Sequence, residues 1–226
     1  MENLKELCLG VGSLCAEYLI LVDKDDNPIG TEEKVKCHLP NGKLHRAFTI
    51  LLFNIDGKLL LTRRSQSKML WPRDWDGTVA SHPRQSETYV SSAERRLPEE
   101  IGVSCKLEYL FKFEYHVPYK NIGSENEICG TLIGIAKDPT RIKLIKEEID
   151  AIKWVSFNEL LDDIKKNPQI YCPWMILALY FLPESETDIL PEHRSILNEC
   201  IRDDIKQILE KPLQYHFPDK SWELKK

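Results

Sequence analysis

A single amphipathic helix placed among short apolar strands constrains the fold of this chain more than any other feature. In residues 88–101 the apolar side chains recur at intervals of three and four, which is the spacing of one buried helix face. These side chains are Val90, Ala93, Leu97 and Ile101. Gly102 follows at once and predicts the end of the helix, because glycine tolerates the backbone conformation that closes a helix.

Short apolar segments on both sides of this helix have the composition of strands. They cover residues 18–22, 47–53, 58–61, 78–80, 107–116, 125–136 and 152–157. The Asp56-Gly57 pair between the second and third segments predicts a β-hairpin. Further helices are expected at residues 158–166, at 173–181 and in a long amphipathic run at 191–209. This order of elements predicts an α/β sandwich with a helical C-terminal extension.

The length and composition of the chain predict one compact domain with additions at its ends. A chain of 226 residues, of which 42% are hydrophobic, can bury one sizeable core. We expect an N-terminal segment at residues 1–17, a core domain at 18–183 and a helical extension at 184–226. The expected boundary lies near Pro183.

Charge and apolar length argue against two classes of partner. A net charge of −5 and a pI near 5.8 argue against nucleic acid, which requires clustered positive charge. The longest apolar stretch, residues 175–182, is far shorter than the roughly 20 residues of a membrane span. Residues 1–16 lack the apolar run of a signal peptide, and seven scattered cysteines fit reduced thiols. We therefore expect a cytoplasmic protein, either a monomer or a homodimer.

Three histidines and two glutamates are of the types that hold a divalent metal ion. The histidines are His38, His45 and His82. Glu125 and Glu127 lie two apart in a predicted strand, so their side chains share one face about 7 Å apart. Histidine nitrogens and carboxylate oxygens together suit Mn²⁺, Mg²⁺ or Zn²⁺. Each residue taken singly also fits an ordinary surface position.

The predicted helix carries a second group of charged residues. The run Arg95-Arg96-Leu97-Pro98-Glu99-Glu100-Ile101-Gly102-Val103 resembles the helical half of the Nudix signature, whose glutamates hold Mg²⁺ on a diphosphate. Glu87 stands at the position of the signature's earlier glutamate. Arg96 and Glu100 lie four apart on one helix face, a spacing that a simple ion pair explains equally well.

Basic residues in an otherwise acidic chain form a third group. Lys34, Arg63, Arg64 and Lys68 lie near predicted loop ends, and Arg96 completes the group. Arginine binds phosphate oxygens with a two-pronged fork and lysine supplies a point charge. The group indicates a local pocket for a small anion.

Together these stretches resemble the type 1 isopentenyl diphosphate isomerases, a family of the Nudix superfamily. The similar segments follow the family's order over about residues 19–181. They are Lys34-x-x-x-His38, Leu44-His45-Arg46-Ala47-Phe48, Thr62-Arg63-Arg64-x-x-x-Lys68, Trp71-Pro72, Ser81-His82-Pro83, the helix described above, Glu125-Asn126-Glu127 and Cys172-Pro173-Trp174. The resemblance implies a Nudix-type α/β/α sandwich and an isoprenoid diphosphate as the substrate.

The resemblance also implies a role for individual residues. The buried divalent metal would be held by His38, His45, His82, Glu125 and Glu127. Glu100 would serve the Mg²⁺ that accompanies the diphosphate, and the diphosphate itself would be bound by Lys34, Arg64, Lys68 and Arg96. Glu127 would also be the acid/base on one face of the substrate, assisted by Tyr115. The ring of Trp174 would face the developing cation, which an aromatic face stabilises without offering a nucleophile.

One position departs from the family. Ala80 stands two residues before His82, where the family has its catalytic cysteine, and Gly77 replaces an asparagine. Moving a double bond requires one proton to be delivered and another to be removed, and alanine can do neither. Cys129 is no obvious substitute because it shares a strand face with Glu127.

Three reactions therefore remain open. The first is isomerisation of isopentenyl and dimethylallyl diphosphate, with water or another group replacing the thiol. The second is cyclisation of a longer prenyl diphosphate, started by a proton from Glu127. The third is diphosphate hydrolysis, which the pairs Trp75-Asp76 and Glu99-Glu100 favour. Arg96, at a glutamate position of the signature, argues against it. A binding protein without catalysis is the weakest alternative, because it would leave five metal ligands without use.

Overall fold

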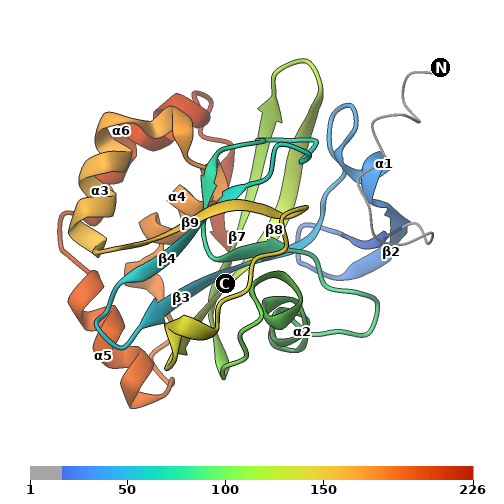
Figure 1. Cartoon of the computed structure of the whole chain (residues 1–226). Coiled ribbons are helices and arrows are strands. Elements are labelled where there is room, and N and C mark those ends of the chain that lie inside the picture. The colour runs from blue at the N-terminus through green and yellow to red at the C-terminus, as the bar shows by residue number, and fades with distance from the viewer. Residues whose placement is uncertain (1–16, 226) are drawn as a thin grey trace.

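The computed structural model describes residues 17–225 and shows a mixed β-sheet with helices against both faces (Figure 1). The strands are β1 (Tyr18–Val22), β2 (Pro28–Glu33), β3 (His45–Asn54), β4 (Leu59–Arg64), β5 (Trp75–Asp76), β6 (Val79–Ser81), β7 (Leu107–Tyr119), β8 (Gly123–Ala136), β9 (Ile149–Val155) and β10 (Trp222–Lys225). The α-helices are α1 (Lys34–His38), α2 (Tyr89–Ile101), α3 (Phe157–Lys166), α4 (Pro173–Tyr180), α5 (Pro191–Cys200) and α6 (Ile205–His216). The interpretation of residues 1–16 as free of a signal peptide falls outside the described residues.

The sheet is built around two long central strands. Its order is β10-β7-β8-β3-β1-β2. Strands β3 and β8 run parallel, with His45 paired to Glu127 and Asn54 paired to Ala136 at the two ends of the shared stretch. Strand β3 also pairs with β6, and β4 continues the sheet to β5 and β9. The parallel register brings His45, the first residue of β3, beside Glu127, the last residue of the Glu125-Asn126-Glu127 segment.

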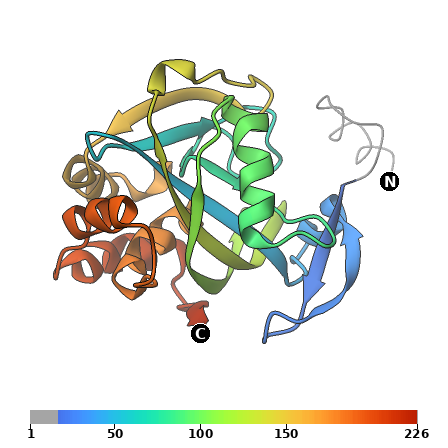
Figure 2. The same ribbon diagram turned by 90° about the horizontal axis from the view of Figure 1, so that it is seen from below.

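The two faces of β3 pack against different helices, which makes the sandwich. Phe48, Ile50 and Leu52 face α2 and pack with its buried side chains. Leu51 and Phe53 face the opposite side, where α3, α4, α5 and α6 contribute to the larger apolar cluster. Figure 2 shows α2 alone on one side of the sheet and the C-terminal helices on the other. The predicted α/β sandwich is confirmed.

Helix α2 has the limits that its sequence predicts. The Thr88 side chain accepts a hydrogen bond from the backbone of Ser91, which caps the first turn. Gly102 closes the helix at φ 71°, a left-handed conformation that favours glycine. Arg96 and Glu100 lie four residues apart within this helix, so their side chains share one side, one turn apart.

The expected hairpin is confirmed but short, whereas the expected C-terminal helix differs from the structure. Strands β3 and β4 share only the pair Phe53–Leu59, because β4 then turns away to pair along its length with β9. The amphipathic run at 191–209 is broken at residues 201–204, where Arg202 forms an ion pair with Asp204 instead of continuing the helix. The chain ends on strand β10, which the sequence did not predict and which pairs with β7.

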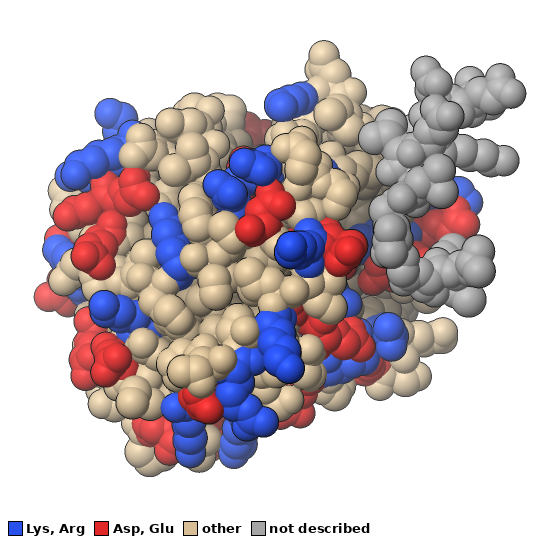
Figure 3. All heavy atoms as spheres, in the orientation of Figure 1, with Lys and Arg blue, Asp and Glu red and all other residues tan. Residues whose placement is uncertain are grey.

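None of the helices in the described part of the chain combines the length and apolar character of a membrane span. On the face drawn in Figure 3, basic and acidic side chains are interspersed.

Candidate functional site

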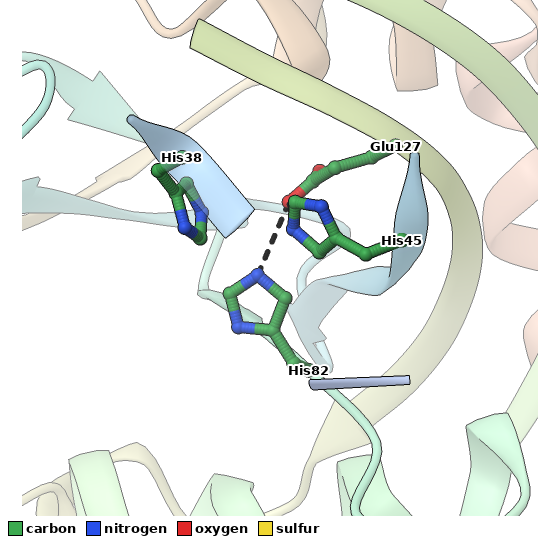
Figure 4. Close-up of side chains that lie close together, drawn as sticks. All are labelled: His38, His45, His82 and Glu127. Carbon is green, nitrogen blue, oxygen red and sulfur yellow. Dashed lines mark hydrogen bonds and ion pairs between the residues drawn. The ribbon is translucent and has the colours of Figure 1, made fainter. Parts of the chain in front are cut away.

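Four side chains from four separate elements converge on one point (Figure 4). His38 is the last residue of α1, His45 opens β3, His82 follows β6, and Glu127 lies in β8. One ligand atom of each lies within 4.8 Å of every other, and all four residues are buried. The ring centroids of the histidines are 4.8 to 5.5 Å apart. We call this group the histidine–glutamate cluster.

Backbone geometry brings the elements of the cluster together. The Nε2 atom of His45 is 3.3 Å from Glu127 Oε1 because the two residues are register partners in the parallel β3–β8 pair. His82 Nε2 lies 3.2 Å from the same oxygen. At Gly123 a Cβ atom would meet the carbonyl oxygen of His38 at 2.7 Å, so glycine permits the close approach of β8 to the end of α1.

Two of the histidines have their ring orientation set by backbone carbonyls. The Nδ1 atom of His38 is 2.6 Å from the carbonyl oxygen of Lys34, and Nδ1 of His45 is 2.7 Å from that of Lys43. A carbonyl can only accept, so each Nδ1 carries the proton and donates it. In the uncharged form of each ring, the Nε2 lone pair therefore points into the cluster, as it does in histidines that bind metal ions.

The unsatisfied atoms of the cluster fit a divalent cation. His45 Nε2 and Glu125 Oε2 are buried without a hydrogen-bond partner among the described residues. Glu125 Oε2 lies 3.0 Å from His38 Nε2, which places the fifth expected ligand beside the four-residue group. Buried polar atoms normally have partners, and imidazole nitrogen with carboxylate oxygen is a donor set for Mn²⁺, Mg²⁺ or Zn²⁺. The residues present could hold such an ion.

The cluster shifts the protonation of its members in different directions. Burial opposes the charged form of His38, but the Glu125 carboxylate outweighs it and raises the pKa to about 8. Burial, and next the Lys34 charge, hold the pKa of His82 well below its usual value. Burial would raise the pKa of Glu127, yet the neighbouring His45 ring brings it below the ordinary value. Opposed shifts in one small space are typical of a functional site.

The cluster opens into a small cavity of about 100 Å³. Tyr115 lines it and donates a hydrogen bond of 2.5 Å to Glu127 Oε2. Trp174, in the first turn of α4, contributes its ring, and Ala80 and Cys129 also line the cavity. Burial and then Glu127 raise the pKa of the Cys129 thiol well above its usual value, so this thiol is neutral at physiological pH.

Three of the four cations expected for a diphosphate line the same cavity: Lys34, Arg64 and Lys68. Arg96 does not line the cavity, but Glu148 lies between Arg96 and Lys68 and contacts both. Glu148 binds the Lys68 ammonium through Oε2, and its Oε1 is 3.7 Å from Arg96 Nη2. Arg96 also binds Glu100 and Glu99. Arg63, the remaining residue of the basic group, is placed over the Trp75 ring instead.

Two acidic residues at this site were assigned no metal or substrate contact from the sequence. Glu148 precedes β9, and no pattern distinguishes it from the neighbouring Glu147. Asp76 enters the sequence interpretation only through the Trp75-Asp76 pair, which favours hydrolysis, yet it is 2% exposed and contacts both Arg64 and Trp174. Only the folded arrangement reveals these contacts, because the partners lie 12 to 98 residues away along the chain.

Known proteins give the same family as the sequence motifs. Residues 43–175 match the family model described as the NUDIX domain. The isopentenyl-diphosphate Delta-isomerase of Haloarcula marismortui is 39% identical over 172 residues, which are 72% of this chain and 89% of that protein. The enzyme of the same name from Salmonella typhi is 36% identical over 163 residues, or 71% of this chain and 89% of that protein.

A solved structure supports the fold. A Deinococcus radiodurans protein aligns with a TM-score of 0.59 at 21% identity, and covers 72% of this chain and 97% of its own. At this identity the likeness concerns the fold alone. The relatives at more than 30% identity span most of their own length on this chain, and they confirm the resemblance drawn from the motifs. The chain is therefore a member of the Nudix superfamily and, within it, of the isopentenyl-diphosphate Delta-isomerase family of enzymes.

Proposed function

We propose that this chain interconverts isopentenyl and dimethylallyl diphosphate by metal-assisted protonation of the alkene. The observation that carries the proposal is that one cavity combines the histidine–glutamate cluster with Lys34, Arg64 and Lys68. The three cations would take the diphosphate, and this would leave the hydrocarbon end of the substrate beside Glu127. Two relatives of this family carry the name of that reaction.

The cluster would hold one divalent ion, Mn²⁺, Mg²⁺ or Zn²⁺, through the five expected ligands: His38, His45, His82, Glu125 and Glu127. When bound, such an ion supplies positive charge that makes its ligands stronger acids. Glu100 would serve a Mg²⁺ that accompanies the diphosphate, next to Arg96. Elemental analysis of the purified protein, with and without each histidine, tests which ion is held.

Glu127 would deliver the proton. Its Oε1 faces His45 and His82, and its Oε2 accepts the Tyr115 hydroxyl, so Oε2 is the oxygen that can exchange a proton with Tyr115. The proton would pass to the terminal alkene carbon and create a tertiary cation. The ring of Trp174 lines the same cavity and would stabilise this charge through its π face.

Loss of a second proton would complete the reaction, and Ala80 cannot take it. The neutral, buried thiol of Cys129 is a weak base and lies on the strand face of Glu127. A proton beside a carbocation is acidic enough to pass to a weak base, so we assign this step to water at the Ala80 side of the cavity. Restoring the thiol with Ala80→Cys is expected to raise the rate.

Cavity size favours a five-carbon substrate over a longer one. The space is about 100 Å³, smaller than the roughly 150 Å³ apolar cavity that accommodates benzene, so it can enclose only a short hydrocarbon end of a substrate. A chain of fifteen or twenty carbons would require a larger space before it could fold back and cyclise. Hydrolysis is disfavoured because Arg96 binds Glu99 and Glu100, two carboxylates that a hydrolytic metal site would use.

The test is a product assay with the full chain, loaded in turn with each ion. Isopentenyl and dimethylallyl diphosphates should interconvert, and in D₂O the product should carry deuterium. Geranyl and farnesyl diphosphates should be recovered unchanged, without phosphate release. Failure to convert either five-carbon compound with any of the three ions would end the proposal.

Location, assembly and domain division are further parts of this proposal. The described cysteines Cys37, Cys105, Cys129, Cys172 and Cys200 are all free thiols, which supports a reducing compartment, and we infer the cytoplasm. We infer a monomer or homodimer, which light scattering distinguishes. We also keep a core at residues 18–183 with an extension at 184–226, although Leu197, Leu209 and Phe217 belong to the core cluster. Limited proteolysis tests that division.

A further inference from the structure

Asp76 is a buried carboxylate set between the two ends of the proposed substrate site. Its Oδ1 accepts hydrogen bonds from the Trp174 indole at 2.8 Å and from the Gly77 backbone at 2.7 Å. Its Oδ2 accepts one from Arg64 Nη1 at 3.3 Å. Only 2% of Asp76 is exposed. The carboxylate therefore joins the arginine expected to bind diphosphate to the indole expected to face the reacting carbons.

The position of Asp76 is set by elements that meet at the cavity wall. Asp76 ends β5 and pairs with Thr62 of β4. The preceding residue, Trp75, accepts the backbone N–H of Cys172, which caps α4. This contact holds β5 against the first turn of α4, where Trp174 lies. A carboxylate at such a site is costly to bury, because its charge leaves water.

We infer that Asp76 is a positioning residue that aims the Trp174 ring at the substrate and strengthens its attraction for positive charge. This inference deepens the proposed function and rests on it. An indole has a single N–H donor, and a carboxylate on that donor fixes the plane of the ring. A negative charge at the N–H edge also raises the electron density of the π face, which attracts a cation.

The Arg64 guanidinium is the reason that the negative charge of Asp76 matters to the Trp174 ring. Its Cζ lies 5.1 Å from the centroid of the Trp174 ring, so a permanent cation already acts on the ring that is to stabilise a second one. Asp76 offsets that positive charge, because its carboxylate accepts hydrogen bonds from both Arg64 and Trp174. Without Asp76, the ring would meet the developing carbocation with Arg64 uncompensated beside it.

Arg64 keeps its own orientation without Asp76. Its Nε donates to the Trp71 carbonyl and its Nη2 to the Leu70 carbonyl, both at 3.0 Å. Of five guanidinium N–H groups, these contacts and the Asp76 bond use three, and two remain for phosphate oxygens. Removing the Asp76 charge should therefore leave the anion site intact and slightly more positive. A variant without the Asp76 charge is therefore expected to bind pyrophosphate as well as or better than wild type, but to have a lower kcat.

The test compares Asp76→Asn with the wild-type protein. Asparagine keeps an oxygen acceptor for the indole but loses the negative charge. A charge-assisted hydrogen bond is roughly twice as strong as a neutral one, which corresponds to about a tenfold loss in kcat. Binding of inorganic pyrophosphate, a ligand for the cationic end alone, should be unchanged or tighter. Asp56→Asn is the control, because Asp56 is exposed in the β3–β4 turn, makes no side-chain hydrogen bond or ion pair among residues 17–225, and should leave both quantities unchanged.

A spectroscopic readout follows the contact directly. The indole N–H resonance of Trp174, assigned by its loss in Trp174→Phe, should move upfield in Asp76→Asn because its acceptor is no longer charged. The inference is overturned if kcat stays within twofold of wild type, if pyrophosphate binding weakens along with kcat, or if the resonance does not move. If the wild-type protein shows no isomerisation at all, the proposed function is wrong. Pyrophosphate binding and the Trp174 resonance would then still test the contact between Asp76 and Trp174.

Discussion

Replacing Glu148 with glutamine is expected to tighten the binding of a diphosphate, although it removes an ion pair. Glu148 binds Lys68 and lies 3.7 Å from Arg96, so it occupies two cations that the substrate would use. Two unit charges at 3.7 Å interact by about 4.5 kcal/mol at an effective dielectric constant of 20. The Glu148 side chain is 30% exposed, so solvent reduces this strongly. We expect a net gain of about 1 to 1.4 kcal/mol, or five- to tenfold in the Kd of pyrophosphate.

The charge of Glu148 persists throughout the useful pH range. Burial favours its neutral form, but Lys68 outweighs burial and holds the pKa at about 2, below the ordinary 4.5. A lowered carboxyl pKa stabilises the folded state above the ordinary value, and that contribution is lost as pH falls from about 4.5 toward 2. The gain in affinity should therefore be constant from pH 6 to 8 and shrink at high salt.

Calorimetric titration of the full chain with inorganic pyrophosphate measures this effect. Glu147→Gln is the matched control, because Glu147 lies next to Glu148 and makes no side-chain contact within residues 17–225, so its Kd should equal that of wild type. The opposite result, weaker binding in Glu148→Gln alone, would show that Glu148 holds Lys68 and Arg96 in place for the ligand. Competition between Glu148 and the diphosphate would then be refuted.

Two further outcomes are expected from the cluster and the C-terminal segment. A metal ion at 100 times its Kd should stabilise the protein by about 2.7 kcal/mol and raise Tm by about 5–10 °C in a chain of this size. In His45→Gln the same addition should leave Tm unchanged, and an equal rise in both proteins would contradict the assigned ligands. Phe217→Ala should lower the free energy of unfolding in urea by about 3–5 kcal/mol, since Phe217 is 1% exposed and its ring centroid lies 6.2 Å from that of Tyr115. Tyr215→Ala, at a residue 60% exposed, should lower it by less than about 0.5 kcal/mol, and equal losses would refute the packing role of Phe217.

The elements that the sequence predicted are those whose own residues carry a periodic apolar pattern. Helix α2 shows one buried face and has its cap residues in place, and most of β3 and the second half of β8 are apolar. Strand β2 was missed because its six residues are exposed or half-buried and show no apolar alternation. Strand β10 was missed because its strand form depends on pairing with β7, a partner more than 100 residues away.

The residues of the candidate site are likewise of two kinds, those that the sequence could identify and those that it could not. The histidine motifs could be recognised because each ligand lies in a short segment of characteristic sequence, and the register of β3 with β8 then brings His45 to Glu127. Asp76 and Glu148 could not be assigned, because each acquires its meaning from partners that other elements supply. For example, Asp76 becomes significant only when α4 brings Trp174 to it.

Proton delivery from Glu127 to a five-carbon diphosphate is decided by proton NMR of isopentenyl diphosphate in D₂O, incubated with the metal-loaded chain. The wild-type protein should convert it to deuterated dimethylallyl diphosphate. Glu127→Gln, provided that it still binds pyrophosphate with the wild-type Kd, should show no conversion above background. Equal conversion by Glu127→Gln would mean that another group delivers the proton.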